Sequence, residues 1–131
     1  MTKKKILIVD DDPGILTMLK LMLHLEGYDP LICEDALQVV DRVEREKPDV
    51  VLLDAMMPRL DGIQVLEQLQ SRNLAHKPPV LLFTGTADDA YTRKALESGA
   101  TGVLVKPFVK EELLGRLQTL LPEIDETQTS L

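Results

Sequence analysis

The sequence predicts an α/β fold, specifically a (βα)5 doubly wound parallel sheet. Short runs rich in apolar and β-branched residues recur five times, and each is followed by a segment with helical apolar spacing. Most of these runs are apolar at every position, which is typical of parallel strands covered by helices on both faces. We expect strands at residues 6–9, 28–33, 50–53, 80–83 and 103–105, and helices at residues 13–26, 35–46, 62–73, 87–98 and 110–121.

Proline and glycine positions support these boundaries and indicate the order of the strands. Asp12 before Pro13 is the pattern of an N-cap followed by proline in the first helical turn, and Gly27 and Gly99 follow helical segments. Pro30 lies within the second strand, where it cannot donate to a hydrogen-bond ladder. We therefore expect that strand at a sheet edge, in the order 2-1-3-4-5, with a ligand-binding switch point between the first and third strands.

Length and composition limit the classes of protein that the sequence can encode. The 131 residues suffice for one domain, expected at residues 1–121, and residues 122–131 are expected to form a flexible acidic C-terminal tail. The formal net charge of −7 disfavours direct binding of nucleic acid. A single cysteine, and no apolar run long enough to span a bilayer, favour a cytoplasmic protein without membrane contact.

Polar side chains follow four of the five expected strands. Asp10, Asp11 and Asp12 follow the first strand, Asp54 follows the third, and Thr84 and Lys106 follow the fourth and fifth. Asp12 is explained as a helix cap, whereas the other groups should meet at the carboxyl edge of the sheet. Neighbouring carboxylates repel one another unless a cation neutralises them, and an all-oxygen site with few ligands suits Mg²⁺.

Four motifs stand at these strand ends, and together they carry a resemblance to a known family. They are the string at residues 6–13, the segment at residues 51–62, the pair Thr84-Gly85 and the triplet Lys106-Pro107-Phe108. In this order and at this spacing they resemble the receiver domain of two-component response regulators, a CheY-like domain with a flavodoxin-like fold. The resemblance covers residues 5 to about 121, and four motifs are far more specific than any one alone.

The resemblance implies a metal-dependent phosphoacceptor. Asp54 would take a phosphoryl group from the phosphohistidine of a sensor histidine kinase or phosphotransfer protein, or from a small acyl phosphate. Mg²⁺ would be bound by Asp11 and Asp54, by Asp10 through water, and by the backbone carbonyl of Met56. The phosphorylated state would then switch the binding of an output partner.

The resemblance also implies which groups would hold the phosphoryl oxygens. Lys106 would pair with one oxygen, the Thr84 hydroxyl would bond another, and the peptide bond before Pro107 would be cis. Phosphoryl transfer needs little more than a nucleophile, in-line geometry and positive charge on the equatorial oxygens. Met56 stands where a phosphatase would need a general acid, so we expect a self-phosphorylating switch and not an enzyme with turnover.

Two other functions are weighed against this one. A pseudo-receiver would keep the fold and serve only for docking or dimerisation, and it predicts the loss of acidic or lysine positions that are all present here. A flavodoxin-like or hydrolase-like enzyme could use a similar sheet, but the aspartates at residues 10–12 would repel a flavin phosphate.

The first helix is unusually apolar. Met18, Met22 and the helix leucines are expected mainly in the core, although some apolar side chains would remain for a partner helix. In the family, the matching kinase-docking region is the surface around Ile15 and Met18 together with Phe108. Cys33 is expected to be a buried strand residue.

Val103 departs from the family pattern, which commonly has Tyr or Phe three residues before the lysine. A valine has no ring to swing when the phosphoryl group is bound, so we expect a smaller change on the face made by the fourth helix, fifth strand and fifth helix. An alternative is that Tyr91 supplies a substitute ring.

Overall fold

Five parallel strands form the sheet in the computed structural model, which describes residues 3–121. Neighbouring strands pair in the order β2-β1-β3-β4-β5. The predicted (βα)5 fold, its strand order and the edge position of the second strand are confirmed. The strands are β1 Lys5–Val9, β2 Asp29–Cys33, β3 Val50–Asp54, β4 Val80–Thr84 and β5 Gly102–Val105.

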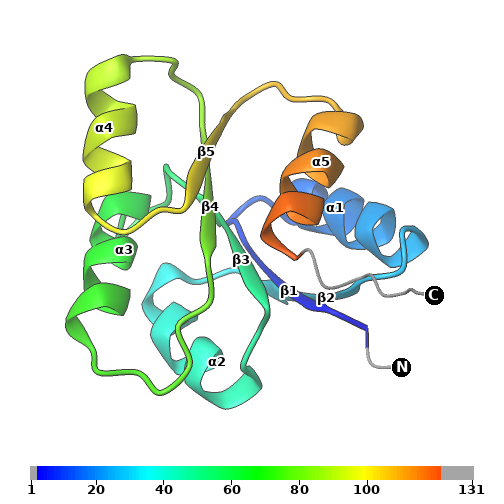
Figure 1. Cartoon of the computed structure of the whole chain (residues 1–131), viewed down its shortest axis with the longest axis horizontal. Coiled ribbons are helices and arrows are strands. Elements are labelled where there is room, and N and C mark those ends of the chain that lie inside the picture. The colour runs from blue at the N-terminus through cyan, green and yellow to red at the C-terminus, as the bar shows by residue number, and fades with distance from the viewer. Residues whose placement is uncertain (1–2, 122–131) are drawn as a thin grey trace.

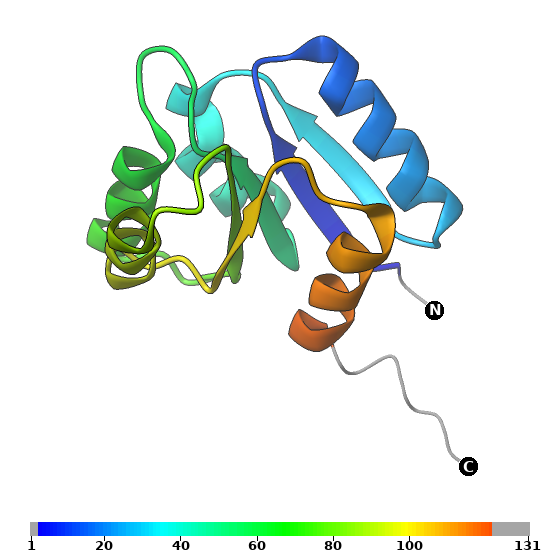
Figure 2. The same cartoon turned by 90° about the horizontal axis from the view of Figure 1, so that it is seen from above.

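Helices cover both faces of the sheet, as a doubly wound fold requires. α2, α3 and α4 lie on one side of the strands, and α1 and α5 lie on the other (Figure 1). Figure 2 shows the same two layers from above, with α1 and α5 apart from α3 and α4. The helices are α1 Pro13–Leu25, α2 Val39–Glu46, α3 Gly62–Ser71, α4 Asp89–Glu97 and α5 Lys110–Leu120, with a 3₁₀ turn at Ala36–Gln38 before α2.

Two predicted helices begin later than expected, and in each segment an aspartate caps the first turn. The predicted helix at residues 35–46 opens as the 3₁₀ turn, in which the Asp35 side chain accepts from the Leu37 amide. The predicted helix at residues 87–98 begins at Asp89, since Asp88 accepts from the Ala90 amide. The predicted tail at residues 122–131 lies outside the described residues.

Alternation along the strands divides the core between the two faces. Leu7 and Val9 belong to the cluster under α2, α3 and α4, and Ile6 and Ile8 belong to the cluster under α1 and α5. All four are fully buried, and Cys33 is buried as predicted. The sheet therefore separates two hydrophobic clusters, and its carboxyl edge carries the loops.

The two outer strands limit their free edges in different ways. The Asp29 amide donates to the Lys4 carbonyl, so alternation turns the position of Pro30 away from β1 and toward the open edge. At the other edge, the Arg116 guanidinium donates to the Val103 carbonyl over 3.1 Å.

Helix α1 begins as predicted but leaves much of its apolar surface exposed. Asp12 caps it by accepting from the Gly14 amide, and Pro13 occupies its first turn. Met18, Leu21 and Leu25 are 57%, 58% and 72% exposed, so the expectation that the methionines and leucines of this helix lie mainly in the core is wrong for these three. Leu16, Leu19 and Leu23 already fill the contact with the sheet. The stripe made by Met18, Leu21 and Leu25, at spacings of three and four residues, therefore faces outward.

No helix among residues 3–121 combines the length and apolar character that crossing a bilayer requires.

Candidate functional site

The predicted site residues come together at the carboxyl edge of the sheet. Asp54 and Thr84 are the last residues of β3 and β4, and Asp10 and Lys106 directly follow β1 and β5. Asp10, Asp54 and Thr84 are 1%, 5% and 3% exposed. The sheet order places β1, β3 and β4 side by side, which explains why groups 74 residues apart in the sequence share one site.

An ion pair joins Lys106 to Asp54, although β4 lies between their strands. The Lys106 ammonium donates to Asp54 Oδ1 over 3.0 Å. Lys106 Nζ lies 4.0 Å from Asp10 Oδ2, close enough for attraction but without a hydrogen bond. The lysine therefore places a positive charge directly beside the Asp54 carboxylate.

Asp10 is a buried carboxylate with one unsatisfied oxygen. Its Oδ1 accepts from the Asp12 amide over 2.9 Å, whereas its buried Oδ2 has no hydrogen-bond partner within residues 3–121. Burial raises the pKa of Asp10, and the nearby charges of Asp54 and Asp11 raise it further, against the lowering effects of the Asp12 amide and Lys106. A cation beside this oxygen would remove the cost of burying it.

Three carboxylates form a group that could hold a metal ion. Asp10, Asp11 and Asp54 each offer an oxygen, and these oxygens all lie within 4.8 Å of one another. Asp11 is exposed, so one side of the cluster opens to solvent. An all-oxygen donor set with one open side and one orphaned buried oxygen fits a hard divalent cation that keeps some of its waters.

The loop after β3 is held at both ends, with Met56 between them. The Ala55 amide donates to the Phe83 carbonyl, and the Gly62 amide donates back to the Ala55 carbonyl, both over 2.8 Å. At the start of α3, Asp61 and Gln64 form a reciprocal capping box. Met56 lies two residues after Asp54 in this loop, and it is 73% exposed.

Thr84 and Lys106 are linked through the backbone as well. The Lys106 amide donates to the Thr84 carbonyl over 2.7 Å, which extends the pairing of β4 and β5 to the site. The Thr84 hydroxyl oxygen accepts from the Thr86 amide over 3.2 Å and so is directed into the loop that leads to α4. The peptide bond between Lys106 and Pro107 is cis, as expected.

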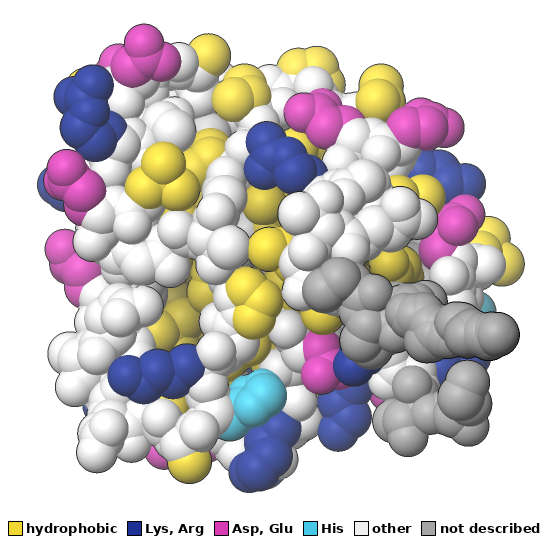
Figure 3. All heavy atoms as spheres, in the orientation of Figure 1, with side chains coloured by type: hydrophobic (Ala, Val, Ile, Leu, Met, Phe, Trp, Pro, Cys, Tyr) yellow, Lys and Arg dark blue, Asp and Glu magenta, His cyan; other side chains and the backbone are white. Residues whose placement is uncertain are grey.

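Val103 and Tyr91 pack on the same face of the sheet. Both are partly buried against the core cluster under α2, α3 and α4. Burial raises the pKa of the Tyr91 phenol, and the carboxylates of Asp61 and Asp54 add to this effect. Figure 3 shows the molecule in the orientation of Figure 1, with hydrophobic side chains exposed in the middle of this face. Val105, the last residue of β5, is 36% exposed.

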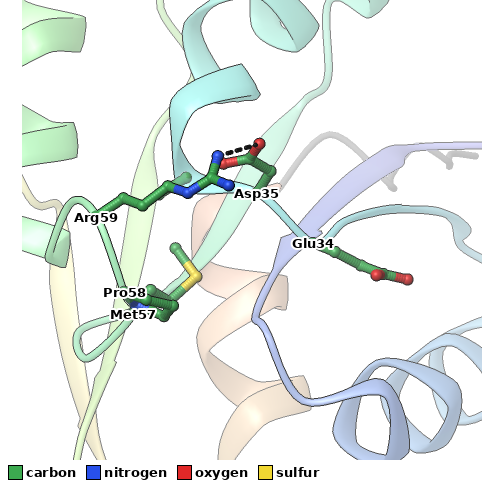
Figure 4. Close-up of a pocket in the computed structure, with 6 residues that line it drawn as sticks. Glu34, Asp35, Met57, Pro58 and Arg59 are labelled. Atoms are coloured by element: carbon green, nitrogen blue, oxygen red, sulfur yellow. Dashed lines mark hydrogen bonds and ion pairs between the residues drawn. The ribbon is translucent and has the colours of Figure 1, made fainter.

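A hollow lies between the loops that follow β2 and β3, and no motif in the sequence predicts it. Its volume is about 280 Å³, and Arg59 reaches across it to Asp35 over 3.3 Å (Figure 4). Arg59 has a left-handed backbone with φ of 75°. The two residues are 24 positions apart on different loops, so no local pattern could have paired them. The hollow is lined by Glu34, Asp35, Ala36, Met57, Pro58 and Arg59.

Comparison with known sequences gives one consistent family. The family model described as response regulator receiver domain matches residues 6–118. The alkaline phosphatase synthesis transcriptional regulatory protein PhoP of Bacillus subtilis is 38% identical over 118 residues, which make up 90% of this chain and 48% of that protein. Response regulator MprA of a Mycobacterium species is 38% identical over 117 residues, or 89% of this chain and 50% of that protein. The chain thus spans about half the length of these curated relatives.

Solved structures of receiver domains have the same fold. The receiver domain of a Francisella response regulator has a TM-score of 0.85 and 29% identity, covering 94% of this chain and 100% of that chain. The receiver domain of a Pseudomonas aeruginosa sensor histidine kinase, with a magnesium ion coordinated in its active-site cleft, has a TM-score of 0.82 and 29% identity, covering 93% and 100%. With the fold, the strand-end residues and the family model in agreement, the chain belongs to the receiver domain family of two-component response regulators.

Proposed function

We propose that this chain is a phosphoacceptor in a two-component phosphorelay, and that Asp54 receives the phosphoryl group from a phosphohistidine or a small acyl phosphate. One observation carries the proposal: the buried Asp54 carboxylate pairs with Lys106 beside the unsatisfied oxygen of Asp10. A merely structural ion pair would not need a second buried carboxylate, that of Asp10, which raises the electrostatic cost of the site.

The proposed transfer uses a carboxylate oxygen of Asp54 as the nucleophile. A bond forms between this oxygen and phosphorus while the bond from phosphorus to the donor's imidazole nitrogen, or to its acyl oxygen, breaks. Lys106 already lies 3.0 Å from Asp54 and would stabilise the negative oxygens of the phosphoryl group. The Thr84 hydroxyl, at the end of the neighbouring strand, would donate to another of these oxygens.

We propose Mg²⁺ as the cation, held by Asp10, Asp11 and Asp54 and by the backbone carbonyl of Met56. When bound, it supplies positive charge that offsets the three carboxylates and the incoming phosphoryl group. The oxygen-only cluster and the orphaned Asp10 Oδ2 support this assignment, as does the magnesium ion in the related Pseudomonas receiver domain.

We propose that phosphorylation is a lasting state and not one step of a turnover cycle. A phosphatase that used an aspartate nucleophile would need a general acid or base beside it. The residue two positions after Asp54 is Met56, whose exposed thioether cannot transfer a proton. The protein is therefore expected to act as a switch, and residues 1–121 are its receiver domain.

The proposed partners are a sensor histidine kinase or a phosphotransfer protein, together with an output protein. The outward apolar stripe of α1, made by Met18, Leu21 and Leu25, would contact a helix of the phosphoryl donor, with the partly buried Ile15 and Phe108 beside it. The net charge of −7 argues against direct contact of this chain with nucleic acid. A free, buried Cys33 fits a reducing compartment such as the cytoplasm.

Acetyl phosphate tests the proposal directly. Incubation with Mg²⁺ should add one phosphate, detected by intact mass, and a chelator should prevent it. Asp54→Asn should abolish the addition. Asp61→Asn is the matched control, because it also removes one carboxylate near the site but keeps an oxygen that can cap α3. A phosphate acquired by the Asp54→Asn protein at the parent rate would show that Asp54 is not the nucleophile.

A further inference from the structure

A ladder of three hydrogen bonds connects the site to α4. The Thr86 amide donates to the Thr84 hydroxyl oxygen, the Asp88 amide donates to the Thr86 hydroxyl oxygen, and the Ala90 amide donates to Asp88 Oδ1. The three distances are 3.2, 3.1 and 3.1 Å. Each bond spans two residues, and together they fix the whole loop between β4 and the first turn of α4. We refer to them as the 84–90 ladder.

Tyr91 directly follows the last residue of this ladder. It lies one helical turn before the fully buried Ala95, so both belong to the stripe of α4 that faces the sheet. Helical side chains lean toward the N-terminus, which directs the Tyr91 ring toward the carboxyl edge of the sheet. The negative charges of Asp61 and Asp54 act on its phenol, in agreement with this direction.

The sheet brings Tyr91, Val103 and Thr84 to one face. Val80 and Leu82 of β4 belong to the core cluster against which Tyr91 and Val103 pack, and Thr84 continues their alternation. Leu82 pairs directly with Val103, and Thr84 lies two residues further along β4 on the same face. The aromatic ring on this face, next to the site, therefore comes from α4 and not from β5.

We propose that Tyr91 is the residue through which the state of Asp54 reaches α4. The proposal rests on the function proposed above: when the Thr84 hydroxyl turns toward a phosphoryl group, its oxygen leaves the Thr86 amide. The ladder then loses its first bond, the loop is released, and the Tyr91 ring shifts against Val103 and Asp61. The compact Val103 side chain leaves the ring of Tyr91 as the larger group that can move on this face.

The chain offers a spectroscopic test with an internal reference, because it contains two tyrosines and no tryptophan. With 3-fluorotyrosine incorporated, ¹⁹F NMR should give two resonances, and Tyr91→Phe assigns them. Tyr28 is buried in the cluster on the opposite face, under α1 and α5. On addition of Mg²⁺ and beryllofluoride, which mimics the aspartyl phosphate, the Tyr91 resonance should shift several-fold more than that of Tyr28.

A substitution within the ladder separates its role from that of the site. Thr86→Val removes the acceptor for the Asp88 amide but changes no residue assigned to metal or phosphate, and Thr86→Ser keeps the hydroxyl as a matched control. Thr86→Val should at least halve the Tyr91 shift while intact mass still finds one phosphate after acetyl phosphate treatment. A phosphorylated parent protein with an unmoved Tyr91 resonance, or a full shift in Thr86→Val, would overturn the role of Tyr91 alone. A parent protein that acquires no phosphate would overturn the proposed function as well.

Discussion

Asp10 shows how a single residue can favour the binding of a cation while it lowers the stability of the protein without one. Its Oδ2 is buried without a hydrogen bond, and its pKa is raised first by burial and then by the charge of Asp54. An ionised carboxylate in this position opposes folding, and a bound cation reverses that effect. We therefore expect a bound cation to stabilise the site.

The raised pKa of Asp10 gives a pH-dependent prediction for the protein in chelator. A carboxyl whose pKa is higher in the folded than in the unfolded state contributes to stability at pH values below its ordinary pKa of 3.8. This contribution is lost as the pH rises through the higher pKa of the folded state. Asp10→Asn keeps the acceptor for the Asp12 amide and cannot ionise. It should be more stable than the parent near neutral pH, by a margin that shrinks toward about pH 4. Urea titrations across this range check it, and a margin that widens on acidification would contradict it.

Asp11 gives a second prediction, on the response to metal. Asp11→Ala removes one repelling charge and one ligand together, so it should raise the melting temperature in chelator and reduce the gain from Mg²⁺. A ligand at a hundredfold excess over its Kd adds about 2.7 kcal/mol to the stability of the folded state, so the parent should melt several degrees higher in Mg²⁺. Asp12→Asn is the control, because it removes a neighbouring charge outside the cluster and keeps the cap of α1. The assignment is wrong if Asp11→Ala responds to Mg²⁺ as fully as the parent.

At the scale of elements, two glycines in helices should respond to alanine with opposite signs. A Cβ at Gly62 would lie 2.7 Å from Leu82 Cδ1 and 2.9 Å from Ala55 Cα, whereas a Cβ at Gly115 would meet nothing within 4 Å. Gly62→Ala should cost about 1–3 kcal/mol through overpacking under α3. Gly115→Ala should stabilise α5 by about 0.5–1 kcal/mol, because alanine is the better helix former. Denaturant unfolding measures both, and equal signs would show that the packing of Gly62 against β4 is looser than described.

The site residues on strand ends could be predicted from sequence because parallel strands end at one edge. That single rule brings Asp10, Asp54, Thr84 and Lys106 together without any knowledge of side-chain direction. The cap at Asp12 was equally accessible, since it depends on neighbours in the chain.

Features that depend on how a helix is rotated, or on contacts between distant loops, could not be predicted. The exposure of Met18 follows from which stripe of α1 faces the sheet, and the whole helix is too apolar for its pattern to decide this. The direction of Tyr91 depends in the same way on the rotation of α4. The ion pair between Asp35 and Arg59 joins two loops and leaves no periodic signal.

For the whole molecule, we expect the change on phosphorylation to be confined to one end of the sheet. Beryllofluoride should slow hydrogen exchange at residues 54–62, which surround Asp54, and should speed it at residues 84–91, where the Thr86 amide loses its acceptor. Residues 102–121 should change little, because Val103 has no ring to carry a signal into β5 and α5. Strong new protection across residues 102–121, or dimerisation through them, would show that the interpretation of Val103 is wrong.

The two open borders of the sheet bear on how this protein behaves when it is concentrated. An unpaired outer strand is a template on which strands of other molecules can assemble into aggregates. On β2 the proline at position 30 removes one donor from the outward row, and on β5 the guanidinium of Arg116 already occupies the Val103 carbonyl. Each edge strand thus lacks a regular series of free backbone groups, so aggregation through strand addition is disfavoured. Association with other molecules is then left to side-chain surfaces such as the outward stripe of α1.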